Sequence, residues 1–197
     1  MIRYDGMKAE EMKGNGGGQL PVGPYVAICL GAKIEGKAPD QTLVLALDVK
    51  EGEYKNFFTN KLQEAKKNGS KYGEPKFKGT YRLRIPNPEN TKALYPETDI
   101  ARMNDMIYRF EKSNPTFHWD CDEQKLPGLT VGINMQEDTY NGNTFTRIGR
   151  LEIADDVRKG LIKAMSPRKR KEQTQAPVQN DVFGGFTPVD PGDELPF

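Results

Sequence analysis

A chain of 197 residues with 36% apolar residues can bury one good-sized core, so the composition predicts a single folded domain with appendages. The first residues, MIRYDGMKAEEMK, lack the apolar core of a signal peptide, and no apolar run is long enough to span a bilayer. With only two cysteines, the chain is expected in the reducing cytoplasm, without a membrane-embedded part.

The formal net charge of +1 hides an uneven distribution along the chain. Residues 176–197 contain no lysine or arginine and four acids, which leaves the rest of the chain with a net charge of +5. A basic body favours polyanionic ligands, whereas an acidic tail is repelled by them. We therefore expect the body and the tail to have different partners.

The N-terminal part combines a predicted loop with two predicted strands. Residues 1–22 are expected to be a flexible segment, because GNGGGQLPVG lacks the Gly-Lys-Ser/Thr ending of a phosphate-binding loop. Strands are predicted over 25–34 and 42–50, each with one buried face. The residues expected on these faces are Val26, Ile28, Leu30, Ala32 and Ile34 in the first strand, and Leu43, Leu45, Leu47 and Val49 in the second.

A helix and a third strand are predicted next. NKLQEAKKNG, residues 60–69, is typical of a short helix that ends at Asn68-Gly69. KFKGTYRLRIP, residues 76–86, alternates strictly and predicts a strand whose two faces differ. One face is apolar, and the other carries Thr80 and a row of four cations, Lys76, Lys78, Arg82 and Arg84.

The end of the body is predicted to hold a second helix and a hairpin. Residues 98–115 place Ile100, Met103, Ile107 and Phe110 at helical spacing. Strands over 129–140 and 144–153 are joined by Asn141-Gly142, a dipeptide suited to a tight hairpin turn. The buried face of the first is expected to hold Leu129, Val131, Ile133 and Met135.

These elements predict a mainly β fold, a five-stranded Greek-key barrel of the oligonucleotide-binding (OB) type with one or two inserted helices. A generic α+β sheet is the alternative. The OB-like nucleic-acid-binding domain is expected over 23–165, followed by a disordered linker over 166–190 that is basic at first and then neutral. An acidic partner-docking tip over 191–197 ends the chain.

Single-stranded nucleic acid is bound by cations that follow the phosphates and by aromatic rings that stack on the bases. Phe57, Phe77, Tyr81 and Phe110 are interpreted as core residues. A solvated face of an edge strand is the alternative interpretation of the cation row, and PRKRK at 167–171 is either a further contact, a solubilising run or a seat for the tail. The predicted DNA-binding residues are Lys55, Lys76, Lys78, Arg82, Arg84, Trp119, Tyr140, Phe145, Arg147 and Arg150.

Catalytic motifs are weak in this sequence. His118 is the single histidine, so a histidine dyad is excluded. Asp40 with Glu53 and Lys55 has the spacing of a magnesium-dependent nuclease hairpin, but such short patterns are common by chance. HWDCDE, residues 118–123, offers metal ligands without a second cluster at zinc-like spacing. We predict no enzymatic activity, no cofactor and no metal.

The C-terminal tip and the body resemble two different groups of proteins. The end of the tail, Asp193, Glu194, Leu195, Pro196 and Phe197, resembles the tip with which bacterial single-stranded-DNA-binding proteins dock onto replication, recombination and repair enzymes, although only two adjacent acids precede the apolar end. GAKIEGK, LVLALDVKEGEYKNFF and the stretch from EKSNPTFHWDCDEQ to DTYNG are similar to replication and recombination proteins encoded by viruses of Gram-positive bacteria.

The resemblances imply a protein of a bacteriophage that acts in the cytoplasm of the bacterial host cell. It would bind single-stranded DNA without reading sequence, protect exposed strands, and recruit host or viral replication and recombination proteins through residues 193–197. Two alternatives stay open, an adaptor that docks on a replication enzyme without binding nucleic acid, and a magnesium-dependent nuclease. The sequence leaves the oligomeric state open, including a homo-oligomer.

Overall fold

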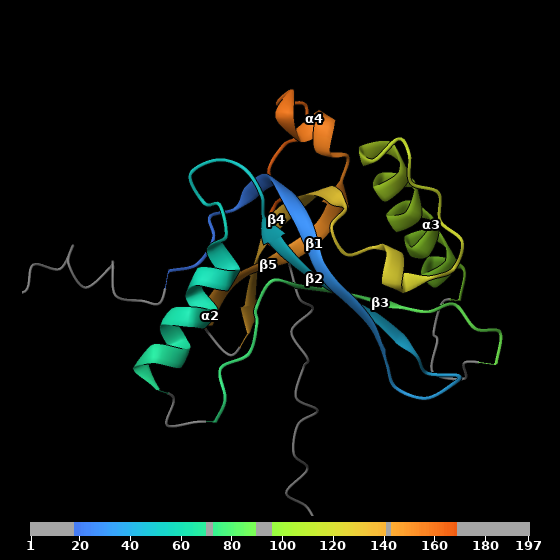
Figure 1. Ribbon diagram of the computed structural model, residues 1–197, viewed down its shortest axis with the longest axis horizontal. Coiled ribbons are helices and arrows are strands. Elements are labelled where there is room, and N and C mark those ends of the chain that lie inside the picture. The colour runs from blue at the N-terminus through green and yellow to red at the C-terminus, as the bar shows by residue number, and fades with distance from the viewer. Residues whose placement is uncertain (1–17, 70–72, 90–95, 141–142, 169–197) are drawn as a thin grey trace, which may run out of the picture.

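The computed structural model describes residues 18–69, 73–89, 96–140 and 143–168. Its strands are β1 (Gly23–Glu35), β2 (Thr42–Val49), β3 (Thr80–Arg84), β4 (Thr130–Tyr140) and β5 (Asn143–Glu152). They form a five-stranded antiparallel sheet in the order β3-β2-β1-β4-β5 (Figure 1). The fourth strand lies beside the first, which is the strand order of a Greek key.

The sheet is open, because β3 and β5 form its two edges and no ladder joins them within the described residues. The prediction of a mainly β fold with five antiparallel strands and inserted helices is therefore confirmed, whereas closure into a barrel is not seen in this part of the chain. The β4–β5 hairpin is also confirmed, since Tyr140 pairs with Asn143 across a two-residue connection. β3 begins only at Thr80, so the lysines predicted in that strand precede it.

The predicted buried face of β1 is wrong in the first half of the strand, where the core residues alternate with the predicted ones, and of the predicted set only Val26 is buried. Leu30 and Ile34 are 49% and 40% exposed, whereas Ala27 and Cys29 are buried in the core. The register of β1 with β2 shifts between Cys29 and Gly31, so an extra residue is inserted there. A bulge of this kind changes which residues face the core, and a strict alternation across it therefore fails.

The faces predicted for β2 and β4 are confirmed, except that Leu129 precedes β4 and is only half-buried. Side chains of β2 and β4 supply most of the core, together with Phe110 and Met106 from helix α3 (Pro96–Ser113). Ile100, predicted on the apolar face of that helix, is instead 49% exposed. The buried residues of the two strands are Leu43, Leu45, Leu47 and Val49 in β2, and Val131, Ile133 and Met135 in β4.

Helices flank the sheet on different sides (Figure 1). Helix α2 (Phe57–Asn68) packs against β2, α3 against β3 and β4, and α4 (Ala154–Arg158) against β1 and β4. A short 3-10 helix, η1 (Glu123–Lys125), follows α3. The predicted end of α2 is confirmed, with a positive φ of 65° at Gly69. The sequence analysis did not predict α4 or η1.

The start of α2 is fixed by a residue from the neighbouring strand. Asn56 precedes the helix with a positive φ of 59° and makes no side-chain cap. Instead, the buried carboxylate of Asp48 accepts hydrogen bonds from the backbone N–H groups of Phe58 (3.0 Å) and Thr59 (2.9 Å). Because the first N–H groups of a helix lack partners inside the helix, this carboxylate satisfies donors that would otherwise be buried without one.

Residues on both sides of the predicted 23–165 domain also pack on the sheet. Leu20 is 1% exposed and belongs to the core, although 1–22 was predicted to be flexible. The Gln19 side-chain amide bonds to the Thr144 carbonyl (3.1 Å) and the Thr146 N–H (2.6 Å) at the β5 edge. At the other end, the Arg168 N–H donates to the Glu137 carbonyl at 2.8 Å. The packed body therefore extends from at least residue 18 to residue 168.

Both cysteines are free thiols, Cys29 in the core and Cys121 at the surface. Burial raises the pKa of Cys29 to about 11, so its thiol stays protonated at neutral pH. Within the described ranges, none of the helices has the length and apolar character needed to cross a membrane.

Candidate functional site

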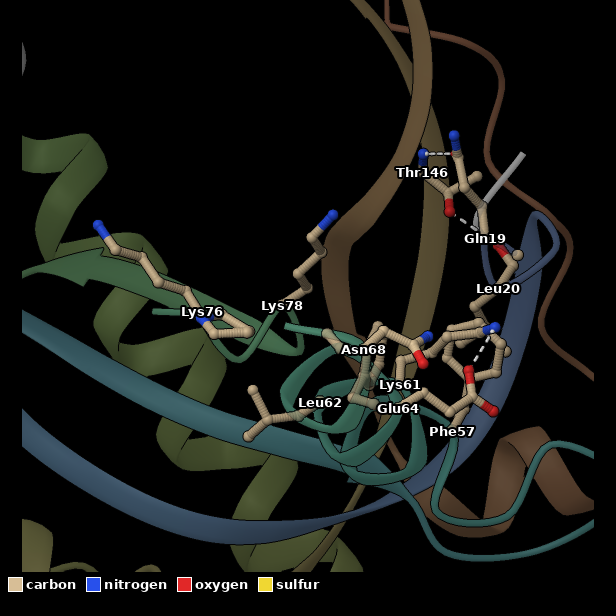
Figure 2. Close-up of a pocket in the computed structure, with 14 residues that line it drawn as sticks. Gln19, Leu20, Phe57, Lys61, Leu62, Glu64, Asn68, Lys76, Lys78 and Thr146 are labelled. Carbon is tan, nitrogen blue, oxygen red and sulfur yellow. Dashed lines mark hydrogen bonds and ion pairs between the residues drawn. The ribbon is translucent and has the colours of Figure 1, made fainter. Parts of the chain in front are cut away.

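A cleft, which we call the α2 cleft, lies between helix α2 and chain segments next to the two edges of the sheet (Figure 2). Its volume is about 360 Å³, and four segments line it: residues 18–20, α2, residues 75–78 before β3, and Thr146 of β5. It therefore joins chain segments next to both edges of the open sheet.

The α2 cleft combines an apolar lining with a basic rim. Leu20, Phe57, Phe58, Leu62 and Ala65 supply the apolar surface, and Lys61, Lys76 and Lys78 supply the cations. The ammonium group of Lys61 lies 3.1 Å from the carboxylate of Glu64, which also lines the cleft. Among the described residues, no carboxylate pairs with Lys76 or Lys78. These two lysines are thus the cations that remain available to an anionic ligand.

A second depression, the sheet groove, lies on β1, β2 and β3 and has a volume of about 580 Å³. Small side chains leave this space open, since Gly31 pairs with Ala46 and Ala46 pairs with Thr80 across the three strands. Three cations line it, Lys33, Lys76 and Arg82. Because side chains of paired residues lie on one face, these cations and Glu35 border the open depression together.

Lys76 lines both the α2 cleft and the sheet groove, so the two depressions meet at this residue. Neighbouring aromatic rings also connect the two depressions. The ring centroids of Phe57 and Phe58 are 5.3 Å apart, and those of Phe58 and Phe77 are 6.0 Å apart. Phe57 and Phe58 line the α2 cleft, and Phe77 lines the sheet groove. The result is a basic surface with partly exposed rings that runs across two depressions.

Gly79 explains why residues 75–78 lie so close to α2. The N–H of Leu47 donates to the Gly79 carbonyl at 2.7 Å. A Cβ atom at Gly79 would lie 2.2 Å from the Leu47 carbonyl oxygen and 2.6 Å from the Phe58 ring. Only glycine fits this close approach of backbone and ring, and it fixes the two lysines beside the cleft.

The structure brings together three of the predicted cations, Lys76, Lys78 and Arg82. Arg82 is not free, since it lies 2.8 Å from Glu35. Arg84 lies 3.7 Å from Asp99 of α3 and lines neither depression. Lys55 is exposed in the turn before α2 and also lines neither. The four cations predicted as one equivalent row therefore differ: Lys76 and Lys78 precede β3, whereas Arg82 and Arg84 lie within β3 and pair with carboxylates.

The arginines predicted on β5 lie beside carboxylates. Arg147 is 3.6 Å from Asp138, and Arg150 is 3.5 Å from Glu152. Asp138 is buried and also lies 3.8 Å from Arg168, the first arginine of PRKRK. Neither β5 arginine lines the α2 cleft or the sheet groove. The charge of these side chains is thus partly compensated within the protein.

Ring placement reverses part of the predicted assignment. Trp119 is half-buried and packs against the core, and its backbone N–H donates to the Glu111 carboxylate (2.9 Å). Phe145 is half-buried on β5, outside both depressions. Tyr140 ends β4, and its side chain lies outside the described part of the chain. Phe57 and Phe77, interpreted as core, pack against it but also line the two depressions.

The sequence analysis missed Lys33, Lys61 and Leu62. Lys33 lies on the same face of β1 as Gly31 and pairs with Val44 of β2. This pairing places Lys33 at the groove, and the sequence alone does not determine it. Lys61 and Leu62 belong to a helix that was predicted, but its neighbours were not. The predicted docking residues Asp193, Glu194, Leu195, Pro196 and Phe197 lie outside the described residues.

The residues of the nuclease-like pattern, which the sequence left as an alternative, do not meet. Asp40 lies in the turn before β2, and Glu53 lies in the turn after it, so the eight residues of β2 separate them. A strand of that length spans about 26 Å, which is too far for two ligands of one ion. Asp120 of the HWDCDE segment pairs with Lys125, and Asp122 caps η1. Across the described ranges, no group of three or more His, Cys, Asp or Glu residues is arranged to hold a metal.

Comparison with known proteins adds no family assignment: no protein-family model matches the chain, and no curated protein matches it.

Glu35 controls how much of the positive charge in the sheet groove is available. Its carboxylate lies 2.7 Å from Lys33 and 2.8 Å from Arg82. Hydrogen bonds from Lys33 and Arg82 lower the pKa of Glu35 below its ordinary value. Glu35 therefore stays ionised at neutral pH, where it competes with any other anion for the two cations.

If single-stranded oligonucleotides bind in the sheet groove, Glu35→Gln should raise their affinity by about two- to five-fold, the strength of an exposed ion pair. The salt dependence should become steeper, because two cations are released to phosphates. Fluorescence anisotropy of labelled oligo-dT measures both. The matched control is Glu89→Gln, a charge removal at an exposed loop residue outside both depressions. Equal effects of the two substitutions would contradict a specific role for Glu35.

Proposed function

We propose that this protein binds single-stranded DNA without reading its sequence, and that the α2 cleft and the sheet groove together form the interface. The observation that carries the proposal is the position of Lys76, which joins two basic, ring-lined depressions into one surface. Cations along a groove with aromatic platforms are the features by which proteins hold single strands irrespective of sequence.

The strand order supports an OB-type assignment of the fold. The oligonucleotide-binding fold is a five-stranded, partly open Greek-key barrel that binds its ligand on the face of its second and third strands. Here β4 lies beside β1, and the sheet groove lies on β1, β2 and β3. We propose that the open sheet is a variant of this fold in which residues 75–78, α2 and residues 18–20 occupy the space between the two edges.

The proposed role of the C-terminal tip rests on its sequence. Residues 193–197 would dock onto host or viral replication and recombination proteins, with the Phe197 ring in an apolar pocket and the acids beside a basic one. In this proposal the protein is encoded by a bacteriophage and acts in the bacterial cytoplasm, where it covers exposed strands and brings enzymes to them.

A titration of labelled oligo-dT at two salt concentrations, with and without magnesium, tests the proposal. We expect binding that weakens with salt and no cleavage. If Lys76 and Lys78 each contact one phosphate while Glu35 holds Lys33 and Arg82, the slope of log K against log salt should be about −1.4, and Glu35→Gln should move it toward about −3. An adaptor without nucleic-acid affinity would show no binding at low salt, and a nuclease would shorten the oligonucleotide when magnesium is present.

The double variant Lys76→Glu/Lys78→Glu should lower oligo-dT affinity at least ten-fold at low salt. The matched control, Lys159→Glu/Lys163→Glu, makes the same charge change at exposed residues outside both depressions. It should produce a much smaller loss, caused by net charge alone. Equal losses in the two double variants would show that binding depends on overall charge rather than on this surface.

A further inference from the structure

We infer that the α2 cleft is a capture site for a single unstacked nucleotide, with its base in the apolar interior and its phosphate at Lys76 and Lys78. The inference rests on the proposed binding of single strands. It assigns base capture to the α2 cleft and not to the sheet groove.

The size and lining of the α2 cleft suit one planar ring system. Its volume of about 360 Å³ is at the small end of ligand pockets, which range over roughly 300–1,000 Å³. Leu20 and Phe58 are 1% and 7% exposed, so the interior is fixed by the core, while the half-buried Phe57 and Leu62 complete the wall. A base has two apolar faces that such a lining can cover.

The charges in the α2 cleft are segregated between its walls (Figure 2). On the α2 wall, Lys61 and Glu64 are joined as an ion pair at 3.1 Å. On the opposite wall, Lys76 and Lys78 have no carboxylate partner among the described residues. A ligand that matches this pattern carries an anion at one side and a neutral ring at the other, which describes a nucleotide with one phosphate. A peptide with several carboxylates would instead place charge near Glu64.

The wall formed by residues 75–78 explains why a base in the α2 cleft would be unstacked from the next base of the strand. Residues 75–78 stand between the α2 cleft and the sheet groove, and Lys76 borders both. A strand that follows the sheet groove can pass its phosphates over Lys76, but a base inside the α2 cleft is then separated by the chain from the base next to it. Lys76 therefore marks the point where the strand changes from one depression to the other.

Photo-crosslinking of oligo-dT that contains 5-iodouracil, with mass-spectrometric mapping of the linked peptide, tests the inference. We expect a crosslink at Phe57. Ala65→Trp, which places a large ring inside the cleft, should remove that crosslink and lower oligo-dT affinity about three- to ten-fold, because the sheet groove still binds. The control is Gln63→Trp, at an exposed α2 residue outside the cleft, which should change neither readout.

The outcomes separate this inference from the proposed function. Oligo-dT binding that persists with crosslinks only outside the α2 cleft would overturn the capture site and leave the function standing. Absence of any oligo-dT binding would overturn both. Should circular dichroism show that Ala65→Trp is unfolded, Lys78→Gln serves instead, with a reduced yield of the Phe57 crosslink expected. Binding of an acidic Leu-Pro-Phe-ending peptide that Ala65→Trp abolishes, with nucleotide binding unchanged, would show that the cleft is a peptide site.

Discussion

Asp48→Ala is expected to lower the free energy of unfolding by about 3 kcal/mol or more. The Asp48 side chain is 1% exposed, and its carboxylate accepts hydrogen bonds from the N–H groups of Val49, Phe58 and Thr59 and from the Thr59 hydroxyl. The substitution leaves several buried donors at the start of α2 without an acceptor, and each such donor costs about 1–3 kcal/mol. Urea unfolding followed by circular dichroism measures the loss as a shift of the midpoint at constant slope.

Asp122→Ala is the matched control for this substitution. Asp122 also caps a helix, but it accepts a single bond, from the Gln124 N–H at 3.0 Å near the surface. We expect that variant to lose about 1 kcal/mol or less. Equal midpoints for the two variants would contradict the cap at Asp48. Because Asp48 holds the start of α2, the proposed binding of oligo-dT in the α2 cleft predicts that its loss also weakens oligo-dT affinity under conditions where the protein stays folded.

Glu152→Ala is expected to destabilise the protein by about 3–5 kcal/mol, because it leaves a buried guanidinium without its partner. Glu152 of β5 lies 2.6 Å from Arg109 of α3, and the two residues are 3% and 8% exposed. Asp105 lies 2.8 Å from Arg109 but is more exposed and compensates only part of its charge. Thermal or urea unfolding measures the effect.

A double variant separates the cost of the unpaired charge from the strength of the ion pair. We expect Arg109→Met/Glu152→Leu to be far more stable than Glu152→Ala, since apolar residues of similar volume replace a buried ion pair at little cost. The coupling energy is the change in unfolding free energy of the double variant minus the sum of the changes in the single variants Arg109→Met and Glu152→Leu. If the double variant were as unstable as the sum of both single variants, the contact between α3 and β5 would not depend on this pair.

The strands that the sequence predicted well are those with an uninterrupted alternation. β2 buries the expected side chains along its whole length, and β4 buries them from Val131 to Met135, because no extra residue is inserted into either strand there. β1 differs because its alternation crosses a bulge at Leu30, and the inserted residue is identified only by the pairing of β1 with β2. Period-two patterns therefore locate strands in this chain but do not locate a shift of register.

The candidate site shows a similar division. Lys76, Lys78 and Arg82 were identified from their own alternation, but their surroundings were not. The counterions of the predicted arginines, Glu35, Asp99 and Asp138, come from other elements, so the sequence could not indicate which cations remain available. Partial burial explains the rings: Phe57 and Phe77 have neighbours typical of core residues, and only the packed structure shows that each also borders a depression.

The side chain of Gln19 has a consequence for the outer edge of β5. Its amide occupies the carbonyl of Thr144 and the N–H of Thr146, the groups to which a further strand would bond. An unprotected edge strand is a template on which other chains pair and aggregate. Here the Gln19 side chain makes the two hydrogen bonds that a neighbouring strand would make. A strand from another chain would have to displace this side chain before it could extend the sheet at these two residues.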